Sequence, residues 1–297
     1  MVVVAIAGGG SGVGSNIVNA ILSDRKHTLV VLSRSKQPDL TSRGVDVRVV
    51  DYGSVEGLKV ALTKVHTVIS CISGYGAVPL TSQLALLQAA KQTGVVRFAP
   101  SDWALDCYDA VEAYADKEAV WEAVRESGLE YTRFINGFWM NVWGPGAPRD
   151  ETDARSGYQG PPFALDLQAG TLVVPGDGSQ KVVSTTMQDI GRFVASSLNL
   201  PAWEPDSRIV GDKMSCNEIP HLVKKVTGRK LEIKHISVKD SEAVIAGETD
   251  FFTKFYHQLL FAIAHGRMDF NATLNQRLPE IRPVTVEEYL RKYWVPD

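Results

Sequence analysis

The chain has 297 residues, of which 44% are hydrophobic and 22% are charged. These values are typical of a globular protein, and a chain of this length can bury a core without disulfides or structural metal. The net charge of −3 lacks the basic excess of a nucleic-acid-binding protein. The three cysteines, Cys71, Cys107 and Cys216, are odd in number and widely spaced. They predict neither a disulfide framework nor a zinc site, and they favour a reduced, cytoplasmic location.

Neither the first residues nor the interior of the chain predicts a membrane segment. Residues 1–7 are apolar, but they are too few for a signal peptide and no basic residues precede them. The longest apolar stretch elsewhere, residues 259–264, is far below the roughly 20 residues that span a bilayer. We therefore expect a protein without a membrane partner.

Six short apolar runs alternate with helical patterns over the first half of the chain. Little polar alternation within the runs indicates strands that are covered on both faces, as in a parallel sheet. The βαβα order predicts an α/β protein with a doubly wound, Rossmann-type parallel sheet. The expected strands are 2–7, 28–32, 45–50, 66–70, 95–99 and 131–135. The expected helices are 13–23, 55–63, 81–93 and 110–126.

Glycine and proline clusters after Trp143 interrupt this pattern and mark a boundary. We place an NADP-binding Rossmann domain at residues 1–150, and a smaller, discontinuous α/β substrate domain mainly at 151–297. Apolar runs near 181–186 and 207–211 predict strands that return to the first domain.

The first expected strand runs into a glycine-rich turn that opens a helix. Backbone N–H groups of such a turn approach a pyrophosphate closely, and the helix N-terminus adds a partial positive charge. The strict G-x-G-x-x-G spacing is absent, and serine stands at the middle position of a G-x-x-G-x-x-G pattern. The candidate pyrophosphate contacts are Gly8, Gly10, Ser11, Gly12, Val13 and Gly14.

The end of the second expected strand indicates which dinucleotide binds. An NAD site usually carries an acid about 20 residues past the last glycine, where it binds the ribose 2′-hydroxyl. Arg34 stands at that place here, followed by Lys36. Two cations suit a 2′-phosphate, because a guanidinium engages phosphate oxygens in pairs. The sequence thus favours NADPH/NADP, with a solvated basic turn as the alternative.

Polar and small residues follow the third and fourth expected strands. Topology alone places Asp51 at the adenine edge, and Ser70, Cys71 and Ile72 beside the pyrophosphate and the nicotinamide ribose. We interpret Cys71 as a packing residue rather than a nucleophile.

Further short motifs extend from the fifth strand to the C-terminus. Together with the glycine loop, Arg34 and Lys36, they resemble the isoflavone reductase-like group of atypical short-chain dehydrogenases. That group includes phenylcoumaran benzylic ether reductase and pinoresinol–lariciresinol reductase, and it is related to the NmrA-like proteins. The resemblance runs over most of the chain, and Ser11 departs from it. The further motifs are 96–103 (VRFAPSDW), Lys117, 128–133, 136–138, 176–178, 189–191 and 284–290.

The resemblance implies that Lys117 is the catalytic residue and also contacts the cofactor. An ammonium group can hold the nicotinamide ribose and stabilise a substrate oxygen as hydride arrives. From its neighbours alone, Lys117 is equally well a mid-helix lysine that reaches solvent. The Tyr-x-x-x-Lys motif of most short-chain dehydrogenases is not met, because Tyr114 is one residue too close. The resemblance also assigns to the cofactor site Pro100, Ser101, Asn136 and Phe138.

Aromatic side chains crowd the helix expected over 250–265. They form either a core stripe or the wall of a pocket for an aromatic or polycyclic substrate, and the sequence leaves both interpretations open. The candidate substrate contacts are Trp103, Tyr114, Phe252 and Tyr256.

The sequence therefore predicts an NADPH-dependent reductase that transfers hydride to a small, aromatic or polycyclic secondary metabolite. A conjugated double bond, a carbonyl or a benzylic ether carbon would accept the hydride. The alternatives are a non-catalytic NmrA-like redox sensor and a cofactor-dependent isomerase. We expect a small-molecule substrate, no metal and no nucleic acid, and we leave a homodimer open.

Overall fold

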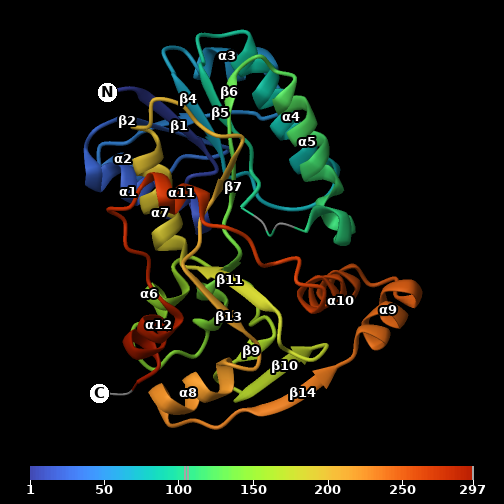
Figure 1. Ribbon diagram of the computed structural model, residues 1–297. Coiled ribbons are helices and arrows are strands. Elements are labelled where there is room, and N and C mark those ends of the chain that lie inside the picture. The colour runs from blue at the N-terminus through green and yellow to red at the C-terminus, as the bar shows by residue number, and fades with distance from the viewer. Residues whose placement is uncertain (104, 106, 296–297) are drawn as a thin grey trace.

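Two stacked lobes make up the molecule, seen in a computed structural model that describes residues 1–103, 105 and 107–295 (Figure 1). The upper lobe holds a six-stranded sheet in the order β3-β2-β1-β4-β5-β6, and its neighbouring strands are parallel. This is the strand order of a doubly wound Rossmann sheet, so the predicted fold class is confirmed. The strands are β1 Val3–Ala7, β2 Thr28–Ser33, β3 Asp46–Val49, β4 Thr67–Ser70, β5 Arg97–Ala99 and β6 Glu130–Tyr131.

Helices cover both faces of this sheet because its strands are apolar on both sides. In β1, Val4 and Ile6 pack with α1 and α7, whereas Ala5 and Ala7 pack with α3, α4 and α5. Successive strand residues point to opposite faces, so one short apolar run contributes to two cores. The helices of this lobe are α1 Gly12–Asp24, α2 Pro38–Ser42, α3 Val55–Ala61, α4 Ala77–Lys91, α5 Ala115–Arg125 and α7 Met187–Ser197.

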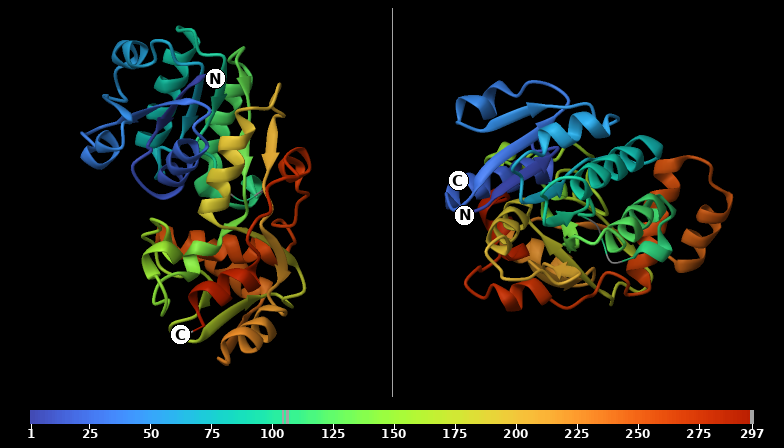
Figure 2. Two further views of the ribbon diagram at one scale, coloured as in Figure 1. Left: turned by 90° about the vertical axis from the view of Figure 1, so that its left-hand side faces the viewer. Right: turned by 90° about the horizontal axis from the view of Figure 1, so that it is seen from above.

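Short strands and most of the remaining helices form the lower lobe (Figure 2). The exception is α11 (Thr273–Arg277), whose Leu274 lies in the core that α1 and α7 share in the upper lobe. Its sheets have the orders β14-β10-β9 and β13-β11-β8, and its core includes Trp143, Leu260 and Trp294. The helix expected over 250–265 is confirmed as α10. The strands are β8 Phe138–Trp139, β9 Leu165–Asp166, β10 Thr171–Pro175, β11 Lys181–Thr185, β13 Asp212–Ser215 and β14 Glu232–Ile236. The helices are α6 Glu151–Arg155, α8 Ile219–Thr227, α9 Val238–Gly247, α10 Phe251–Ala264 and α12 Val286–Tyr293.

The strands expected to return to the six-stranded sheet do not join it. β11 pairs with β8 and β13, and β12 (Asp206–Arg208) pairs with β7 (Arg133–Ile135). The strand expected over 131–135 is split at Thr132, because the chain changes partners there. The Thr132 hydroxyl donates to the Ser207 hydroxyl at 2.8 Å. Two elements nevertheless return to the upper lobe. α7 packs against α1, and Ile209, which follows β12, lies in the same core as Val4 and Ile6 of β1.

The helix expected over 110–126 begins only at Ala115. Val111 and Tyr114 are buried in the core of the lower lobe, so the chain turns toward that lobe before α5 starts. Lys117 therefore lies in the first turn of α5, and the prediction of a mid-helix position is wrong. The two 3-10 turns that precede α5 are η1 Tyr108–Ala110 and η2 Glu112–Tyr114.

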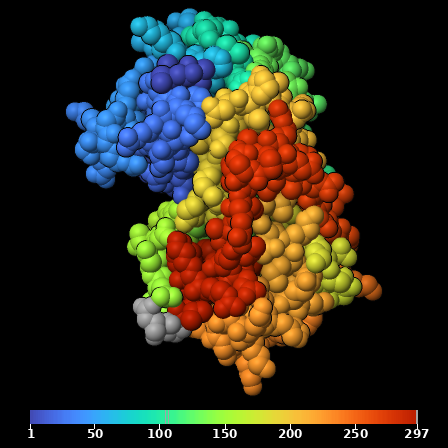
Figure 3. Space-filling model, turned by 60° about the vertical axis from the view of Figure 1, so that its left-hand side comes forward, coloured from blue at the N-terminus to red at the C-terminus, as the bar shows by residue number. Residues whose placement is uncertain are grey.

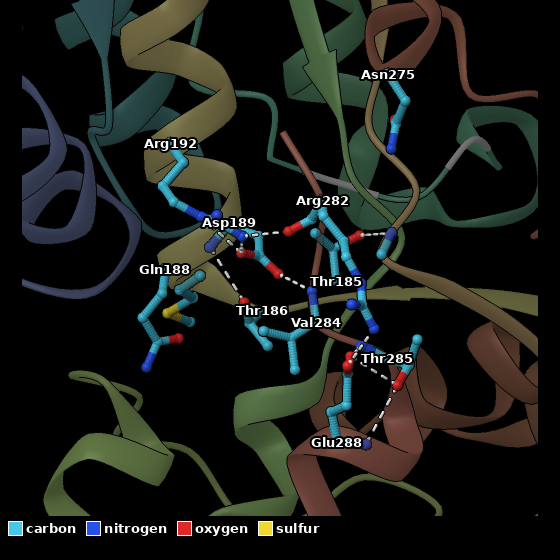
Figure 4. A network of polar contacts seen from close by, with 12 residues as sticks. Thr185, Thr186, Gln188, Asp189, Arg192, Asn275, Arg282, Val284, Thr285 and Glu288 are labelled. Carbon is cyan, nitrogen blue, oxygen red and sulfur yellow. Dashed lines mark hydrogen bonds and ion pairs between the residues drawn. The ribbon is translucent and has the colours of Figure 1, made fainter. Parts of the chain in front are cut away.

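The C-terminal segment ties α7 to the lower lobe. Figure 3 shows this segment in red, running beside α7 and down over the lower lobe. The buried Asp189 carboxylate accepts hydrogen bonds from the Arg192 guanidinium and, at 2.7 Å, from the Val284 N–H (Figure 4). Arg192 also donates to the Arg282 carbonyl at 2.8 Å. One buried carboxylate thus joins a helix of the upper lobe to the chain that leads into α12.

The contact between α7 and α1 depends on a glycine. A Cβ at Gly191 would stand 2.5 Å from the Asn16 carbonyl oxygen, which is closer than packed atoms approach. Asn16 is also bound from the lower lobe, since its side-chain amide donates to the Ser156 carbonyl at 3.1 Å and accepts from the Ser156 hydroxyl at 2.8 Å. α1 is therefore fixed from two sides.

We predict that Gly191→Ala lowers the free energy of unfolding by about 1–3 kcal/mol, because the added methyl group forces α7 away from α1. Gly247→Ala is the matched control: nothing lies within 4 Å of its Cβ, so its stability should stay within about 1 kcal/mol of the original. Urea unfolding measures both changes. Equal midpoints for the two variants would contradict the assigned contact.

Candidate functional site

The turn between β1 and α1 can be built only with glycine at two positions. Gly8 has a φ of 81°, and a Cβ there would lie 2.6 Å from the Cys71 carbonyl oxygen. A Cβ at Gly14 would lie 2.2 Å from the Gly8 carbonyl oxygen. The Cys71 N–H donates to the Ala7 carbonyl at 2.7 Å. Thus the carboxyl ends of β1 and β4 meet the N-terminus of α1 at van der Waals distance, as in dinucleotide-binding turns.

The tip of this turn is open. Gly10 and Ser11 are exposed and Gly12 is half-buried. Ser11 is the N-cap of α1 in an extended conformation, but its hydroxyl caps no backbone N–H. Val13 is buried against the sheet, so only its backbone can contribute to a binding site. A helix N-terminus with uncapped N–H groups attracts anions.

Two unpaired cations stand beside the turn, at the carboxyl end of β2. Arg34 and Lys36 are exposed, and no acidic side chain pairs with either within the described residues.

Gln37, which the sequence did not indicate, also lies beside the turn. The Gln37 amide donates to the Ser33 hydroxyl at 3.1 Å. The Gln37 Oε1 lies 3.2 Å from the point that a Cβ atom would occupy at Gly10. The only sequence signal for Gln37 was its place after a basic turn, yet it joins that turn to the glycine loop.

The residues after β3 and β4 lie at the same edge of the sheet. Asp51 is exposed, and its carboxylate accepts the Gly53 N–H at 2.8 Å. Ser70 is buried, while Ile72 is half-buried beside the cleft that contains Lys117. Burial raises the pKa of the Cys71 thiol well above its ordinary value, so the thiol stays protonated. Its interpretation as a packing residue fits this environment.

The ammonium group of Lys117 is held by the loop that follows β5. Lys117 Nζ donates to the Ser101 carbonyl at 3.0 Å and to the Asp102 carbonyl at 2.6 Å. The loop is fixed in turn by Gln83 of α4, whose Oε1 accepts the Ser101 N–H at 2.6 Å. Burial lowers the pKa of Lys117, and the negative charge of Asp102 opposes that shift. Gln83 and Asp102 were given no role by the sequence, because nothing in it showed that they meet Lys117.

Lys117 lines a narrow cleft between the loop after β4 and the start of α5. The cleft has about 10 Å³ of free space, close to the volume that one water molecule needs. Its lining residues include Ile72, Tyr75, Gln83, Ser101 and Lys117.

Aromatic rings from both lobes stand around this cleft. The Tyr75 ring centre lies 5.5 Å from that of Phe251 and 5.4 Å from that of Phe255. Phe255 meets the buried Tyr114 edge-on at 6.1 Å, and Lys117 Nζ lies 5.9 Å from the Tyr114 ring centre. The aromatic helix α10 therefore faces the lysine side of the sheet.

A second aromatic group continues from the first. Phe138 stacks on Phe163 at 4.8 Å, and Tyr256 packs edge-on to Phe163 at 5.0 Å.

Asn136 is fully buried; its amide donates to the Gly137 carbonyl at 2.9 Å, while its Oδ1 has no hydrogen-bond partner. A buried oxygen without a partner is expected where a bound polar ligand would supply the missing hydrogen bond.

Two of the candidate substrate contacts, Trp103 and Phe252, differ sharply in their surroundings. Trp103 is buried: its indole N–H donates to the Ser70 carbonyl at 2.9 Å, and its ring stacks on Phe134 at 5.3 Å. It is a packing residue beneath the site. Phe252 is 72% exposed and meets Phe251, because it lies on the outer face of α10.

Pro100 is buried in the loop that receives Lys117, and its carbonyl accepts the Asp102 N–H at 2.9 Å.

Neither a cluster of metal-binding side chains nor an apolar helix of membrane-spanning length occurs in the described residues. Within them, no three or more His, Cys, Asp or Glu side chains gather as a metal site would require. Among the described helices, none combines the length and the apolar character needed to cross a bilayer.

Comparison with known proteins agrees with this geometry. The model of the NmrA-like family matches residues 2–290. Oxidoreductase BOA1 of Botryotinia fuckeliana (strain B05.10) is 35% identical over 239 residues, which cover 77% of each protein. A structure from a study of pinoresinol-lariciresinol and phenylcoumaran benzylic ether reductases gives a TM-score of 0.79 at 22% identity and 98% coverage of both chains. AtPrR2 with NADP+ and (+)pinoresinol gives 0.77 at 21% identity, again with 98% coverage of both chains.

The parallel sheet and the glycine turn define a Rossmann-type fold, and the similarity to named oxidoreductases identifies the chain as an oxidoreductase. The chain belongs to the NmrA-like family. The family resemblance inferred from the motifs is thereby confirmed. The two solved structures establish a shared fold, and the ligands in their names belong to those proteins.

We predict that Tyr256→Ala lowers the free energy of unfolding by about 1–3 kcal/mol, because it removes a half-buried ring that packs on Phe163. Phe252→Ala, on the exposed face of the same helix, should change stability by no more than about 0.5 kcal/mol. Thermal unfolding compares the two variants. A larger loss for Phe252→Ala would overturn the assignment of the two faces of α10.

Proposed function

We propose that this protein is an NADPH-dependent reductase of a small aromatic or polycyclic molecule. The observation that carries the proposal is the Lys117 ammonium, fixed by two carbonyl oxygens in a narrow cleft with aromatic rings around it. The cleft lies at the carboxyl edge of the parallel strands, where α/β proteins bind their ligands.

The residues present fit an NADPH molecule. Gly8 and Gly14 let α1 pack closely on the ends of β1 and β4. Gly10 and Gly12 put no side chain at the open tip of the turn, and Ser11 has a free hydroxyl at the N-terminus of α1. Arg34 and Lys36 would bind the 2′-phosphate by charge-assisted hydrogen bonds. When bound, the nicotinamide supplies the hydride. The NADP+ in the AtPrR2 structure, which shares this fold, supports the same choice.

Lys117 would act on the substrate. Two of its three N–H groups are taken by the carbonyls of Ser101 and Asp102, so one N–H remains for a substrate oxygen. Negative charge grows on that oxygen as hydride is added to the adjacent carbon system. An ammonium held in place stabilises this charge without reorganising, and it can then give up a proton.

The substrate would be flat and largely apolar. Tyr75, Tyr114 and Phe255 offer ring faces and edges near Lys117, and aromatic rings favour offset or edge-on partners. Some of these side chains must move to admit a ring system, because the free space in the cleft matches a single water.

Cofactor preference tests the basic turn. We predict that NADPH binds about ten- to a hundredfold more tightly than NADH, since a charge-assisted phosphate contact contributes about 1.5–3 kcal/mol. Arg34→Asp should abolish or reverse this preference. Arg43→Asp changes the charge equally, but its guanidinium binds Asn19, so the preference should persist. Tryptophan fluorescence titrations give the six affinities, two cofactors for each of the three proteins. Equal binding of both cofactors by the unaltered protein would refute the role of Arg34.

Turnover tests the lysine. We predict that Lys117→Met lowers kcat by roughly 10²- to 10⁴-fold, as for loss of a positioned acid, while NADPH binds within about tenfold of its original affinity. Lys91→Met, on an exposed position at the end of α4, is the control and should be fully active. NADPH absorbance is followed with a panel of aromatic enones, quinones and benzylic ethers.

The same assay separates the alternatives. A redox sensor would bind NADPH but consume none with any substrate. An isomerase would convert a substrate without net loss of NADPH. If the unaltered protein is active and Lys117→Met is equally fast, the catalytic assignment is wrong.

A further inference from the structure

The loop that receives Lys117 also carries a buried carboxylate for which the proposed reaction has no role so far. Asp102 is 3% exposed, and its Oδ1 makes no hydrogen bond in the structure. The carbonyl oxygen of this same residue accepts a Lys117 N–H at 2.6 Å. One backbone contact thus brings the ammonium to the residue that carries this carboxylate.

Burial by itself would remove both charges. Burial raises the pKa of Asp102 and lowers that of Lys117, because each charged form loses its hydration. The opposite charge of the partner works against both shifts. Each group therefore stabilises the charged form of the other.

Within the described residues, Asp102 is the one acidic neighbour of Lys117 that is both buried and has an oxygen without a hydrogen bond. Asp116, next to it in sequence, uses its carboxylate to accept the Gly76 N–H at 3.1 Å. The Tyr114 ring faces the ammonium but carries no charge, because burial raises the pKa of its hydroxyl. Asp102 is the only group whose charge bears on the Lys117 pKa within the described residues.

The other groups around Asp102 come from three elements. Lys117 and Glu118 face it from α5, Tyr108 from η1, and Arg133 from β7. Arg133 is already occupied: it pairs with Asp206 at 2.6 Å, and its guanidinium lies 4.5 Å from the Tyr108 ring centre. Lys117 is therefore the cation left for the Asp102 carboxylate, whose interaction with it is larger than that with Arg133.

We propose that Asp102 is the counter-ion that keeps Lys117 protonated inside the closed cleft, and that it acts as a positioning residue for the proton-donating step. The catalytic consequence rests on the proposed reductase function, but the charge pairing itself does not. Asp102 touches no substrate. It maintains the ammonium at neutral pH, and its backbone carbonyl aims the side chain.

Titration of Lys117 in the protein without ligands tests the pairing. Lysine labelled with ¹³C at Cε reports its protonation by NMR, and the signal that disappears in Lys117→Met identifies Lys117. We expect its midpoint to lie above neutral pH but below those of the exposed lysines. In Asp102→Asn the midpoint should fall by about 1–3 pH units, the usual effect of losing an opposite charge nearby.

Two variants control for a merely structural effect. Asp102→Glu restores the negative charge and should return the midpoint toward its original value. Asp116→Asn removes a neighbouring carboxylate already engaged by Gly76, and it should leave the midpoint unchanged. A folded Asp102→Asn protein with an unshifted midpoint would overturn the proposal, as would an equal shift in Asp116→Asn.

The unaltered protein provides a test if Asp102→Asn does not fold. Because paired groups titrate together, the Lys117 signal should show a second step at acid pH, where Asp102 takes up its proton. A single alkaline step would overturn the pairing.

Kinetics then connects the pairing to the reaction. The activity that needs the ammonium is lost as pH rises through the Lys117 pKa, so Asp102→Asn should move this loss to lower pH by the same 1–3 pH units. If no substrate is reduced, the proposed function fails while the NMR result on Asp102 still holds. If turnover depends on Lys117 but its titration does not depend on Asp102, only the counter-ion role fails.

Discussion

The close packing of α1 against three other stretches of backbone is the constraint on which the rest of this structure depends. Gly14 brings the first turn of α1 against the end of β1, and Gly191 brings α7 against its middle. Ser156 of the lower lobe makes two hydrogen bonds to the Asn16 side chain of α1. Interiors packed at this density tolerate almost no added volume. The helix whose N-terminus faces the proposed pyrophosphate site is therefore also the element through which the two lobes meet.

This arrangement explains why the site draws on both lobes. α7 lies far along the chain from the Rossmann strands, but it completes one of their cores, and the Asp189 carboxylate attaches the C-terminal segment to it. The lower lobe is held beneath the carboxyl edge of the sheet in consequence. From there α10 presents Phe251 and Phe255 to Tyr75 of the upper lobe. The position of the Lys117 cleft at this junction follows from the packing of α1 and α7.

Enclosure of the cleft has an electrostatic consequence. A lysine at an open edge would be charged without assistance, but Lys117 is half-buried in a narrow cleft, and burial lowers its pKa. Two carbonyl oxygens and one buried carboxylate stand around it. Fixed dipoles and charges of this kind stabilise a developing oxyanion more strongly than water does. In the proposed reductase, the same enclosure that would favour an apolar substrate would also make a counter-ion for Lys117 necessary.

The sequence by itself determined the parallel sheet, the glycine turn and the family. Each of these is written in local patterns: apolar runs of strand length, glycines at the turn, and short motifs in fixed order. The tertiary structure decided what depends on distant contacts. α5 starts at Ala115 because Val111 and Tyr114 are drawn into the core of the other lobe. Trp103 is buried because Phe134 and the Ser70 carbonyl receive it. Gln37 joins the site beside Gly10, and Gln83 joins it through Ser101, both of which are distant from them in sequence. Asp102 joins it through Lys117 and through a charge whose effect depends on burial. Neither a distant contact nor the degree of burial is encoded in a local sequence pattern.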